Sequence, residues 1–385
     1  MLNVMVKKNS NPRATGSRRN GTTHDLIVVG ASAGGIDAFQ NLLRELPADL
    51  PAAVLLVIHT SAHSPYLLPT IFNRVGTVKA VPNVTDGLRI QPGHLYIAPP
   101  DMHLMVDYGR VRLVHGPKEN RHRPAIDPLF RSAARAYGPR VIGAILTGNL
   151  DDGSAGLVAV KACGGITVVQ DPLDALYPEM PRHALSQLNP DYCLPLRGIG
   201  PLLKGLVMEG VNSRRDGHMS ERIKRETEIA ELAGPMNDMA GLGKPSSLTC
   251  PECNGALWEI KEGKMLRYRC HVGHAFSGES LDSGQAEELE SALWSAVRSL
   301  EEREMLLRRL AENARRQRHH LVAAEFEKRF RELAPAAKTI RSILIKPVSR
   351  PANAALAINE EPAGHERRKH RPRRRQLLVH YGGGR

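Results

Sequence analysis

The chain has 385 residues, enough for two or three folded units, and a formal net charge of +13 at pH 7. No apolar run reaches membrane-spanning length and no secretory signal pattern opens the sequence, so we expect a soluble, cytoplasmic protein without a membrane span. The positive charge does not indicate a nucleic-acid partner, because most of it lies in two runs, residues 1–24 and 367–375, that contain no acidic side chain.

Composition and apolar periodicity divide the chain into six consecutive parts. Both ends lack the periodicity of helices or strands, and we expect them to be disordered. The predicted parts are a basic N-terminus (1–24), an α/β domain (25–210), a polar linker (211–247), a cysteine-containing module (248–280), a helical hairpin (285–346) and a basic tail (351–385). Within the linker, a charged helix over Ser220–Leu232 is the alternative to irregular structure.

The α/β domain opens with a buried strand, Leu26–Val29, and a helical pattern follows from Ile36. Ser32 lies in the tight turn between them, in a Gly-x-Ser-x-Gly spacing that matches a nucleophile elbow. Such a turn exposes a hydroxyl at the carboxyl edge of a sheet and points the first N–H groups of the helix at the reacting carbonyl. The alternative interpretation is a glycine-rich nucleotide-binding turn in which Ser32 only caps the helix.

Strand and helix patterns then alternate along the domain, which predicts a doubly wound, mostly parallel, Rossmann-like sheet with helices on both faces. Residues 94–115 interrupt the alternation and predict a hairpin with its turn near Tyr108 and Gly109. The predicted strands are Leu26–Val29, Ala53–Ile58, His94–Ala98, Val111–His115, Val141–Leu146, Ile166–Gln170 and Tyr192–Pro195. The predicted helices are Ile36–Leu46, Pro65–Asn73, Pro128–Tyr137, Ala155–Ala162, Pro181–Gln187 and Pro201–Met208.

Two further polar groups follow strands of the same predicted sheet. His59 ends the run Val54–Ile58, and the pair Asp151 and Asp152 follows the strand that ends at Leu146. Because the carboxyl ends of parallel strands meet at one edge, Ser, His and Asp are expected to converge there as a nucleophile, its base and an orienting acid. Taken singly, His59 is equally explained by a bond to a backbone carbonyl, and Asp152 by capping of the next helix.

The cysteine module has the spacing of a metal site. Cys250 and Cys253 are two residues apart, and Cys270 and His274 follow after a hairpin-like segment, which indicates a tetrahedral zinc ribbon. His271 competes with His274 as the fourth ligand, and the alternative to a metal site is a set of reduced surface cysteines. Four protein ligands indicate a structural ion. The two remaining cysteines, Cys163 and Cys193, are predicted to be buried thiols.

The region after the module predicts two amphipathic helices. Apolar residues recur at three- and four-residue spacing from about Gln285 to Gln317 and again from about Leu321 to Leu344. We expect an antiparallel hairpin joined near His319 and His320. Pro335 is expected to kink or split the second helix.

The α/β domain resembles the catalytic domain of the chemotaxis methylesterase CheB. One matching segment is the strand that ends in His59. The others, in order, are Val29-Gly-Ala-Ser-Ala-Gly-Gly35, Gly93-His-Leu-Tyr-Ile-Ala-Pro-Pro100, Asn120-Arg-His-Arg-Pro124, Asp127-Pro-Leu-Phe130, Leu146-Thr-Gly148, Asp152-Gly153 with Gly156, and Glu179-Met-Pro-Arg182. The resemblance implies Ser32 as nucleophile, His59 as general base and acid and Asp152, not Asp151, as orienting carboxylate. Catalysis would need no cofactor. The implied oxyanion and substrate-lining residues are Ala33, Gly34, Gly148 and Asn149.

The resemblance also implies a substrate: a glutamate γ-methyl ester on the cytoplasmic helices of a chemoreceptor or related sensory protein. The family deamidates selected receptor glutamines through the same acyl-enzyme. In the basic cluster 121–123, Arg121 and Arg123 are interpreted either as a docking site for a glutamate-rich helix or as part of a solvated loop.

Three features depart from the family pattern. Ala33 stands where members often have Thr, and Asn149-Leu150 stands where they commonly have Met-Gly. About 24 residues precede the first strand, where a typical member has a phosphoacceptor receiver domain. We therefore expect the C-terminal module and helices to bind a regulatory partner. The alternative function is a catalytically diverged interaction protein that uses the zinc ribbon and hairpin as its partner surface.

Overall fold

The structure is a computed structural model of the chain, and it describes residues 23–211, 219–232, 241–262 and 265–345. Both predicted tails, apart from residues 23 and 24, lie outside the described residues, and so do residues 212–218 and 233–240 of the predicted linker. The chain divides into two compact units, residues 1–289 and 290–385, each described here by itself. No helix in the described ranges combines the length and the apolar character needed to cross a membrane.

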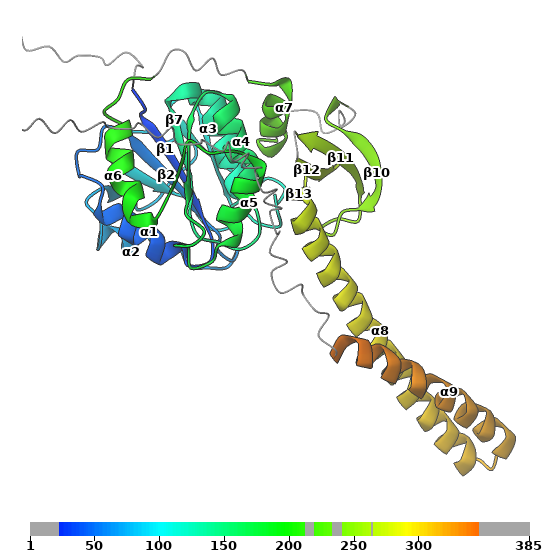
Figure 1. Cartoon of the computed structure of the whole chain (residues 1–385). Helices are drawn as coiled ribbons and strands as arrows, with labels where there is room; N and C mark the ends of the chain where they lie inside the picture. Colours follow the sequence, from blue (N-terminus) through cyan, green and yellow to red (C-terminus); the bar gives the residue numbers. More distant parts are fainter. Residues whose placement is uncertain (1–22, 212–218, 233–240, 263–264, 346–385) are drawn as a thin grey trace, which may run out of the picture. The chain divides into compact units, whose positions relative to one another are not determined.

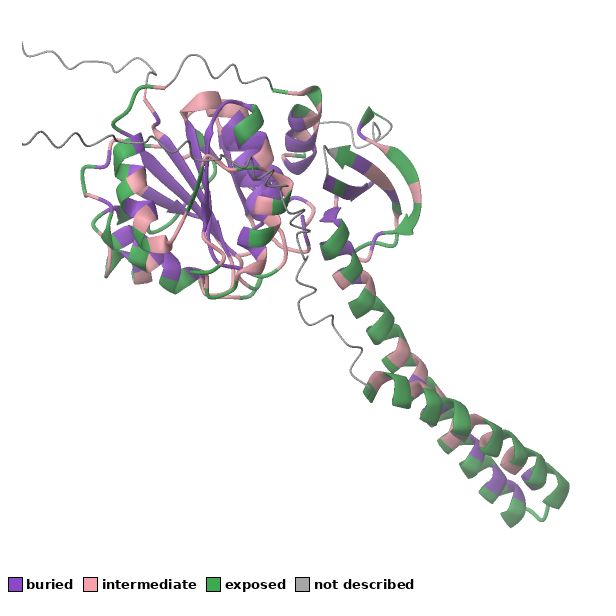
Figure 2. Cartoon of the chain, in the orientation of Figure 1, coloured by how far each residue is buried: buried purple, intermediate pink, exposed green. Residues whose placement is uncertain are grey.

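The first unit is built on a seven-stranded sheet in which every neighbouring pair is parallel (Figure 1). Its strands are β1 (Leu26–Ala31), β2 (Ala53–Ile58), β3 (Lys79–Ala80), β4 (His94–Ile97), β7 (Val141–Ile145), β8 (Ile166–Gln170) and β9 (Tyr192–Leu194). Their order across the sheet is β3-β4-β2-β1-β7-β8-β9. The central strands are buried on both faces, which explains their unbroken aliphatic sequences (Figure 2). The predicted doubly wound, mostly parallel sheet is confirmed.

Helices cover both faces of this sheet. They are α1 (Gly35–Arg44), α2 (Leu68–Asn73), α3 (Ile126–Tyr137), α4 (Ser154–Ala162), α5 (Glu179–Gln187) and α6 (Leu196–Leu206). Alternate residues of β1 enter two separate cores: Ile27 and Val29 pack with α1, α2 and α6, while Leu26 and Val28 pack with α3, α4 and α5. The period-two geometry of a strand thus links the two helical layers through one sheet.

The segment 94–115 is only partly the predicted hairpin. The strands β5 (His103–Asp107) and β6 (Arg110–Val114) form it, with Tyr108 and Gly109 at positive φ in the turn. β4, however, lies in the main sheet beside β2. A second prediction, that Cys193 is buried, is also wrong: it lies on the edge strand β9 and is exposed, whereas Cys163 is buried as predicted.

A short helix and a second sheet complete the first unit. Helix α7 (Glu221–Ala230) contacts α3. The strands β10 (Lys244–Thr249), β11 (Ala256–Glu262), β12 (Met265–Cys270) and β13 (Ala275–Ser277) form an antiparallel sheet in that order. The predicted linker therefore contains one helix and the start of a strand, and the cysteine module packs within the same compact unit as the α/β domain.

Five buried charges join the α/β domain, α7 and β12. Glu119 accepts from Arg131 at 2.6 and 2.7 Å and from Arg269 at 3.1 Å. Glu226 accepts from Arg267 at 2.9 Å through both carboxylate oxygens. All five side chains are at most 4 % exposed. Removing one partner from such a set leaves a buried charge without compensation, so these ion pairs couple the three segments strongly.

The ion pairs predict acid sensitivity. Burial alone would raise the pKa of Glu226, but the three arginines around it outweigh that effect and lower the pKa from 4.5 to about 2; the pKa of Glu119 is also lowered, again against burial, by Arg131 and Arg269. A lowered folded-state pKa contributes stability above the unfolded-state value and loses it below. The free energy of unfolding is therefore expected to fall by on the order of 3 kcal/mol for Glu226 as the pH drops from about 4.5 to about 2. Urea unfolding at pH 6, 4 and 3 measures this.

The matched variant is Glu226→Gln, which lacks the titrating carboxyl. It is expected to be less stable at pH 6, because Arg267 loses the charge of the Glu226 carboxylate, but to lose less further stability on acidification than the unsubstituted chain. Equal pH slopes for the two proteins would show that these pairs do not control acid stability.

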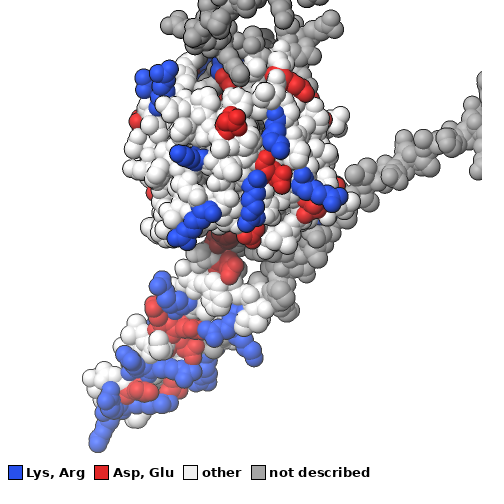
Figure 3. Space-filling view, turned by 90° about the vertical axis from the view of Figure 1, so that its left-hand side faces the viewer, with Lys and Arg blue, Asp and Glu red and all other residues white. Residues whose placement is uncertain are grey.

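The second unit contains most of a helical hairpin. Helix α8 (Gly278–Arg316) begins earlier than predicted, inside the first unit, and α9 (His320–Ile345) follows it. The ion pairs Glu301–Arg341 and Arg315–Glu327 establish the antiparallel arrangement. Pro335 does not split α9, which is continuous through it. Charges of both signs alternate over the hairpin, whereas the visible face of the first unit carries them sparsely (Figure 3).

Candidate active site and candidate metal centre

Ser32 occupies the turn between β1 and α1. Its N–H donates to the carbonyl of Thr147 at 3.0 Å, and its own carbonyl accepts from the N–H of Gly35 at 2.9 Å. Gly34 has a φ of +71°, a conformation that costs glycine little and other residues more. The backbone of the turn is thus tied to the end of the neighbouring strand β7, and the Ser32 hydroxyl is held at the carboxyl edge of the sheet.

His59 lies between Ser32 and Asp152, as the strand-end argument predicts. Its Nδ1 is 3.0 Å from the Ser32 Oγ, and its Nε2 is 2.8 Å from the Asp152 Oδ2. An ionised Asp152 requires the proton on Nε2, which leaves Nδ1 free to accept the serine proton. In the common Ser-His-Asp arrangement the two ring nitrogens have the opposite assignment, but the chain of proton donors and acceptors is the same.

Asp152 is held by four donors in a dry environment. Its side chain is 1 % exposed. Besides His59, its oxygens accept from the N–H groups of Ile126 (2.7 Å) and Asp127 (3.3 Å) and from the Asn120 Nδ2 (2.9 Å). Burial alone would raise the pKa of Asp152, but the hydrogen bond and charge of His59 and the Ile126 N–H outweigh burial and lower it. The carboxylate is therefore ionised at neutral pH.

Asp151, the alternative carboxylate in the sequence, does not contact His59. Burial raises its pKa to about 6, and its Oδ1 has no hydrogen-bond partner among the described residues. The structure thus brings Ser32, His59 and Asp152 together and leaves Asp151 outside the group.

His122 lies next to the site. From the sequence it is interpreted only as a member of the basic cluster 121–123. Its ring stacks on that of His59 with centroids 3.7 Å apart and an interplanar angle of 11°. Burial, and the proximity of His59, lower the pKa of His122 to about 3, so the stacked ring is neutral. A neutral ring restricts the plane of His59 without a second positive charge beside it. The spacing of the sequence carries no signal for this contact.

The backbone donors near Ser32 are not equally available for an oxyanion. The N–H of Gly148 donates to the Tyr177 carbonyl at 3.0 Å, so it has no hydrogen left for substrate. The N–H groups of Ala33, Gly34 and Asn149 have no acceptor among the described residues. Of the four predicted positions, these three keep the donor that an oxyanion needs.

Gly148 instead leaves room for the side chains of Ser32 and Met180. A Cβ added there would lie 2.6 Å from the Met180 Sδ and 2.9 Å from the Ser32 Cβ. We expect Gly148→Ala to displace Ser32 from His59 and to slow covalent labelling of the Ser32 hydroxyl by a fluorophosphonate by about 10- to 100-fold, since small displacements of reacting groups are that costly. The control is Gly205→Ala, where an added Cβ meets no atom within 4 Å. Equal labelling rates for the two variants would contradict this role.

The two arginines predicted to dock substrate already have partners in the chain. Arg121 donates to the Ser283 Oγ at 2.8 Å and pairs with Glu287. Arg123 donates to Asp101 at 2.7 and 2.8 Å and to the Gly116 carbonyl. Docking by either arginine stays a prediction. Ser283 and Glu287 lie 162 and 166 residues from Arg121, and Asp101 lies 22 residues from Arg123, so no local pattern indicates these contacts.

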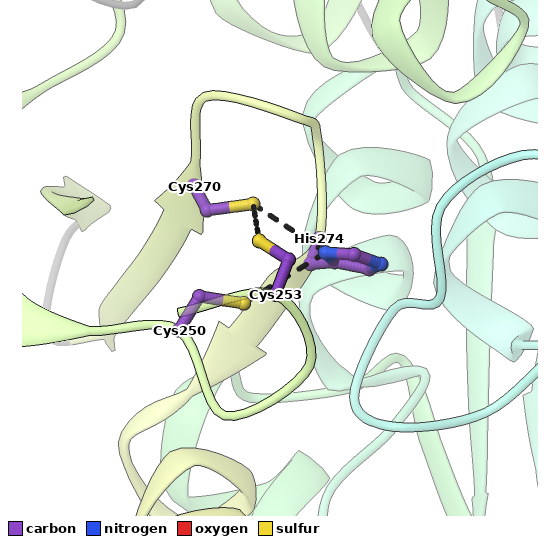
Figure 4. Close-up of side chains that lie close together, drawn as sticks. All are labelled: Cys250, Cys253, Cys270 and His274. Atoms are coloured by element: carbon purple, nitrogen blue, oxygen red, sulfur yellow. Dashed lines mark hydrogen bonds between the residues drawn. The ribbon is translucent and has the colours of Figure 1, made fainter. Parts of the chain in front are cut away.

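The four predicted metal ligands converge in the ribbon (Figure 4). The donor atoms of Cys250, Cys253, Cys270 and His274 all lie within 4.8 Å of one another. Cys253 Sγ is 3.7 Å from Cys270 Sγ, and the His274 Nδ1 is 3.5 and 3.7 Å from the thiols of Cys270 and Cys250. A tetrahedral ion with bonds of about 2.0 to 2.3 Å places its ligand atoms about 3.5 to 3.8 Å apart. The set can therefore hold a metal ion, and His271 is not part of it.

Comparisons with known proteins match the α/β domain. A family model described as CheB methylesterase matches residues 27–203. A protein-glutamate methylesterase/protein-glutamine glutaminase of Ralstonia nicotianae is 39 % identical over 184 residues, which cover 47 % of this chain and 48 % of that protein. A putative enzyme of the same name from Leptospira interrogans is 35 % identical over 192 residues, or 50 % of this chain and 99 % of that one.

A solved structure, the catalytic domain of the CheB methylesterase of Thermotoga maritima, matches with a TM-score of 0.45 and 31 % identity, covering 48 % of this chain and 100 % of that one. The chain spans about half the length of the Ralstonia protein and of the Xanthomonas relatives that it also matches.

Proposed function

Because this chain belongs to the CheB methylesterase family, we propose that it hydrolyses glutamate γ-methyl esters on chemoreceptor-type proteins and deamidates selected glutamines at the same site. The observation that carries the proposal is the hydrogen-bonded series Ser32–His59–Asp152 at the carboxyl edge of the sheet. Relatives carry the combined name methylesterase and glutaminase, which supports both activities. The proposed substrate is a sensory protein that acts in chemotaxis or in a related signalling pathway.

The geometry gives each residue one role in an acyl-enzyme mechanism. The Ser32 Oγ attacks the ester carbonyl while His59 Nδ1 takes its proton, and Asp152 stabilises the imidazolium through Nε2–H. The N–H groups of Ala33, Gly34 or Asn149 stabilise the oxyanion. His59 returns the proton to the leaving methoxide, which departs as methanol. Water activated by His59 then cleaves the acyl-Ser32 bond and yields the free glutamate. A glutamine substrate follows the same steps and releases ammonia.

The ribbon supplies a structural zinc site in this proposal. Cys250, Cys253, Cys270 and His274 provide three thiolates and one imidazole, a donor set that zinc prefers and that leaves no coordination position open for catalysis. The triad itself requires no cofactor. Ligand thiols must be reduced to bind zinc, which supports a cytoplasmic location.

The test is methanol release from methylated receptor fragments, combined with labelling by a fluorophosphonate. Release of methanol from methylated fragments but not from unmethylated ones, with the label mapped to the Ser32 peptide by mass spectrometry, is expected. The absence of both methanol and label would overturn the proposal. It would favour the alternative of an interaction protein with the ribbon and hairpin as its partner surface. Label without methanol would retain the serine hydrolase mechanism and reject this substrate class.

A further inference from the structure

The segment 118–123 lies between the triad and the C-terminal part of the first unit. Its backbone joins the edge of the ribbon: the Asn120 N–H donates to the Ala275 carbonyl at 2.8 Å, and the Ala275 N–H donates to the Lys118 carbonyl at 3.2 Å. Glu119 pairs with Arg269 of β12 at 3.1 Å, and Lys118 with Glu252 at 2.9 Å. The ribbon therefore fixes the position of the segment 118–123.

Asn120 connects this segment to the catalytic aspartate. Its Nδ2 donates to the Asp152 Oδ1 at 2.9 Å and to the Asp127 Oδ2 at 3.0 Å, and the residue is 5 % exposed. Two carboxylates that accept from the same nitrogen lie close together and repel one another unless that donor stays between them. Burial, and the charge of Asp152, raise the pKa of Asp127 to about 7. The amide nitrogen of Asn120 is thus the donor that both carboxylates share.

The other end of the same amide is held by the start of α8. The Asn120 Oδ1 accepts from the Ser277 N–H at 3.0 Å and from the Ser280 hydroxyl at 3.2 Å. A rotation of the amide by 180° would place its oxygen against two carboxylates and its nitrogen against a backbone N–H. The two donors from Ser277 and Ser280 therefore fix the orientation in which Asn120 supports Asp152.

From these contacts we propose that Asn120 is a positioning residue of the Ser32–His59–Asp152 triad, and that Ser277 and Ser280 hold it in place. The C-terminal part of the chain thereby becomes a component of the active site although it contributes no catalytic residue. This inference rests on the proposed function, because the orientation of Asp152 matters only if His59 acts as the base. It goes beyond that function by assigning the ribbon and the first turn of α8 a direct effect on the rate.

The experiment compares Ser280→Ala with Ser283→Ala in the full chain. Both serines lie in α8 and both donate to or accept from the segment 118–123, but Ser283 contacts Arg121 and not Asn120. Ser280→Ala is expected to lower kcat about 3- to 10-fold with KM unchanged, and Ser283→Ala to leave kcat within about twofold. Asn120→Ala is expected to lower kcat about 10- to 100-fold.

Two readouts separate positioning from simple loss of stability. In Asn120→Ala the acid limb of the pH profile of kcat is expected to shift to higher pH, because Asp152, which is bonded to His59, loses the Asn120 Nδ2 donor. Ser280→Ala is expected to give a smaller shift in the same direction, because the Asn120 amide keeps its bond to Asp152 but loses one of the two donors that fix its orientation. The rate of fluorophosphonate labelling of Ser32 should fall in parallel, whatever the substrate. Thermal melting identifies a variant that fails to fold. If Ser280→Ala fails to fold, Ser280→Cys replaces it, because cysteine has nearly the same shape as serine and is a weaker hydrogen-bond donor.

Equal kcat values and pH profiles for Ser280→Ala, Ser283→Ala and the unsubstituted chain would overturn the inference while the proposed function stands. Absence of labelling in the unsubstituted chain would instead reject the proposed function itself.

Discussion

Replacing Asp152 by asparagine is expected to lower kcat for methyl-ester hydrolysis by about four orders of magnitude. Each oxygen of Asp152 faces two donors: His59 Nε2 and the Ile126 N–H on one side, Asn120 Nδ2 and the Asp127 N–H on the other. An amide has one NH₂ group, so in either orientation it places a donor against two donors. If the NH₂ faces His59, the ring takes the other tautomer, and Nδ1–H then points at Ser32 and cannot accept its proton.

The matched control is Asp151→Asn, which makes the same chemical change one residue earlier. Asp151 does not contact His59, and burial raises its pKa to about 6, which means that the site disfavours the charge that the amide removes. Its kcat is expected to stay within about threefold of the unsubstituted chain. Methanol release at saturating substrate measures both variants, with thermal melting as the check on folding. A similar loss of rate in both would assign the effect to general disturbance of the turn and not to the triad.

The elements that position the triad could be predicted because they follow local rules. A buried strand, a tight Gly-rich turn and an amphipathic helix are visible in the order of residues around Ser32. The rule that parallel strands end at one edge then brings His59 and Asp152 to the same place without knowledge of their contacts. The ribbon could be predicted for a similar reason, because the spacing of the cysteines along the chain indicates which side chains converge as ligands.

The support of the triad could not be predicted, because it depends on contacts between distant segments. Asn120 and Arg121 have positive φ values in an irregular loop, so no periodicity indicates where their side chains point. Arg121 reads as a free basic group in the sequence but pairs with Glu287. Asn120 bonds to residues 32 positions away on one side and about 160 away on the other. Gly148 likewise reads as an oxyanion donor, yet its N–H is bonded to Tyr177.

Removing the proposed zinc ion by chelation is expected to affect the whole first unit, not the ribbon alone. Without an ion, three thiols and an imidazole converge within 4.8 Å with nothing to hold them, and small zinc ribbons lose their fold in that state. The ribbon strand β12 supplies Arg267 and Arg269 to the buried carboxylates of Glu226 and Glu119. A carboxylate left buried without its partner costs about 3 to 5 kcal/mol, so chelation is expected to lower the melting temperature of the α/β domain as well.

Chelation is expected to lower activity as well, although the ribbon contributes no residue to the triad. When the ribbon loosens, Ala275 and Ser277 no longer hold Asn120, and Asp152 loses one of its four donors. Chelation, or Cys270→Ser, should therefore reduce the bound zinc measured by mass spectrometry, the melting temperature and kcat together, and added zinc should restore all three in the chelated chain. The control is Cys193→Ser, an exposed cysteine outside the cluster, for which all three values should be unchanged. A chelated chain that keeps its melting temperature and its kcat would show that the ribbon and the triad are independent. If the contacts through Glu119 and Asn120 couple them, loss of the ribbon must change both values.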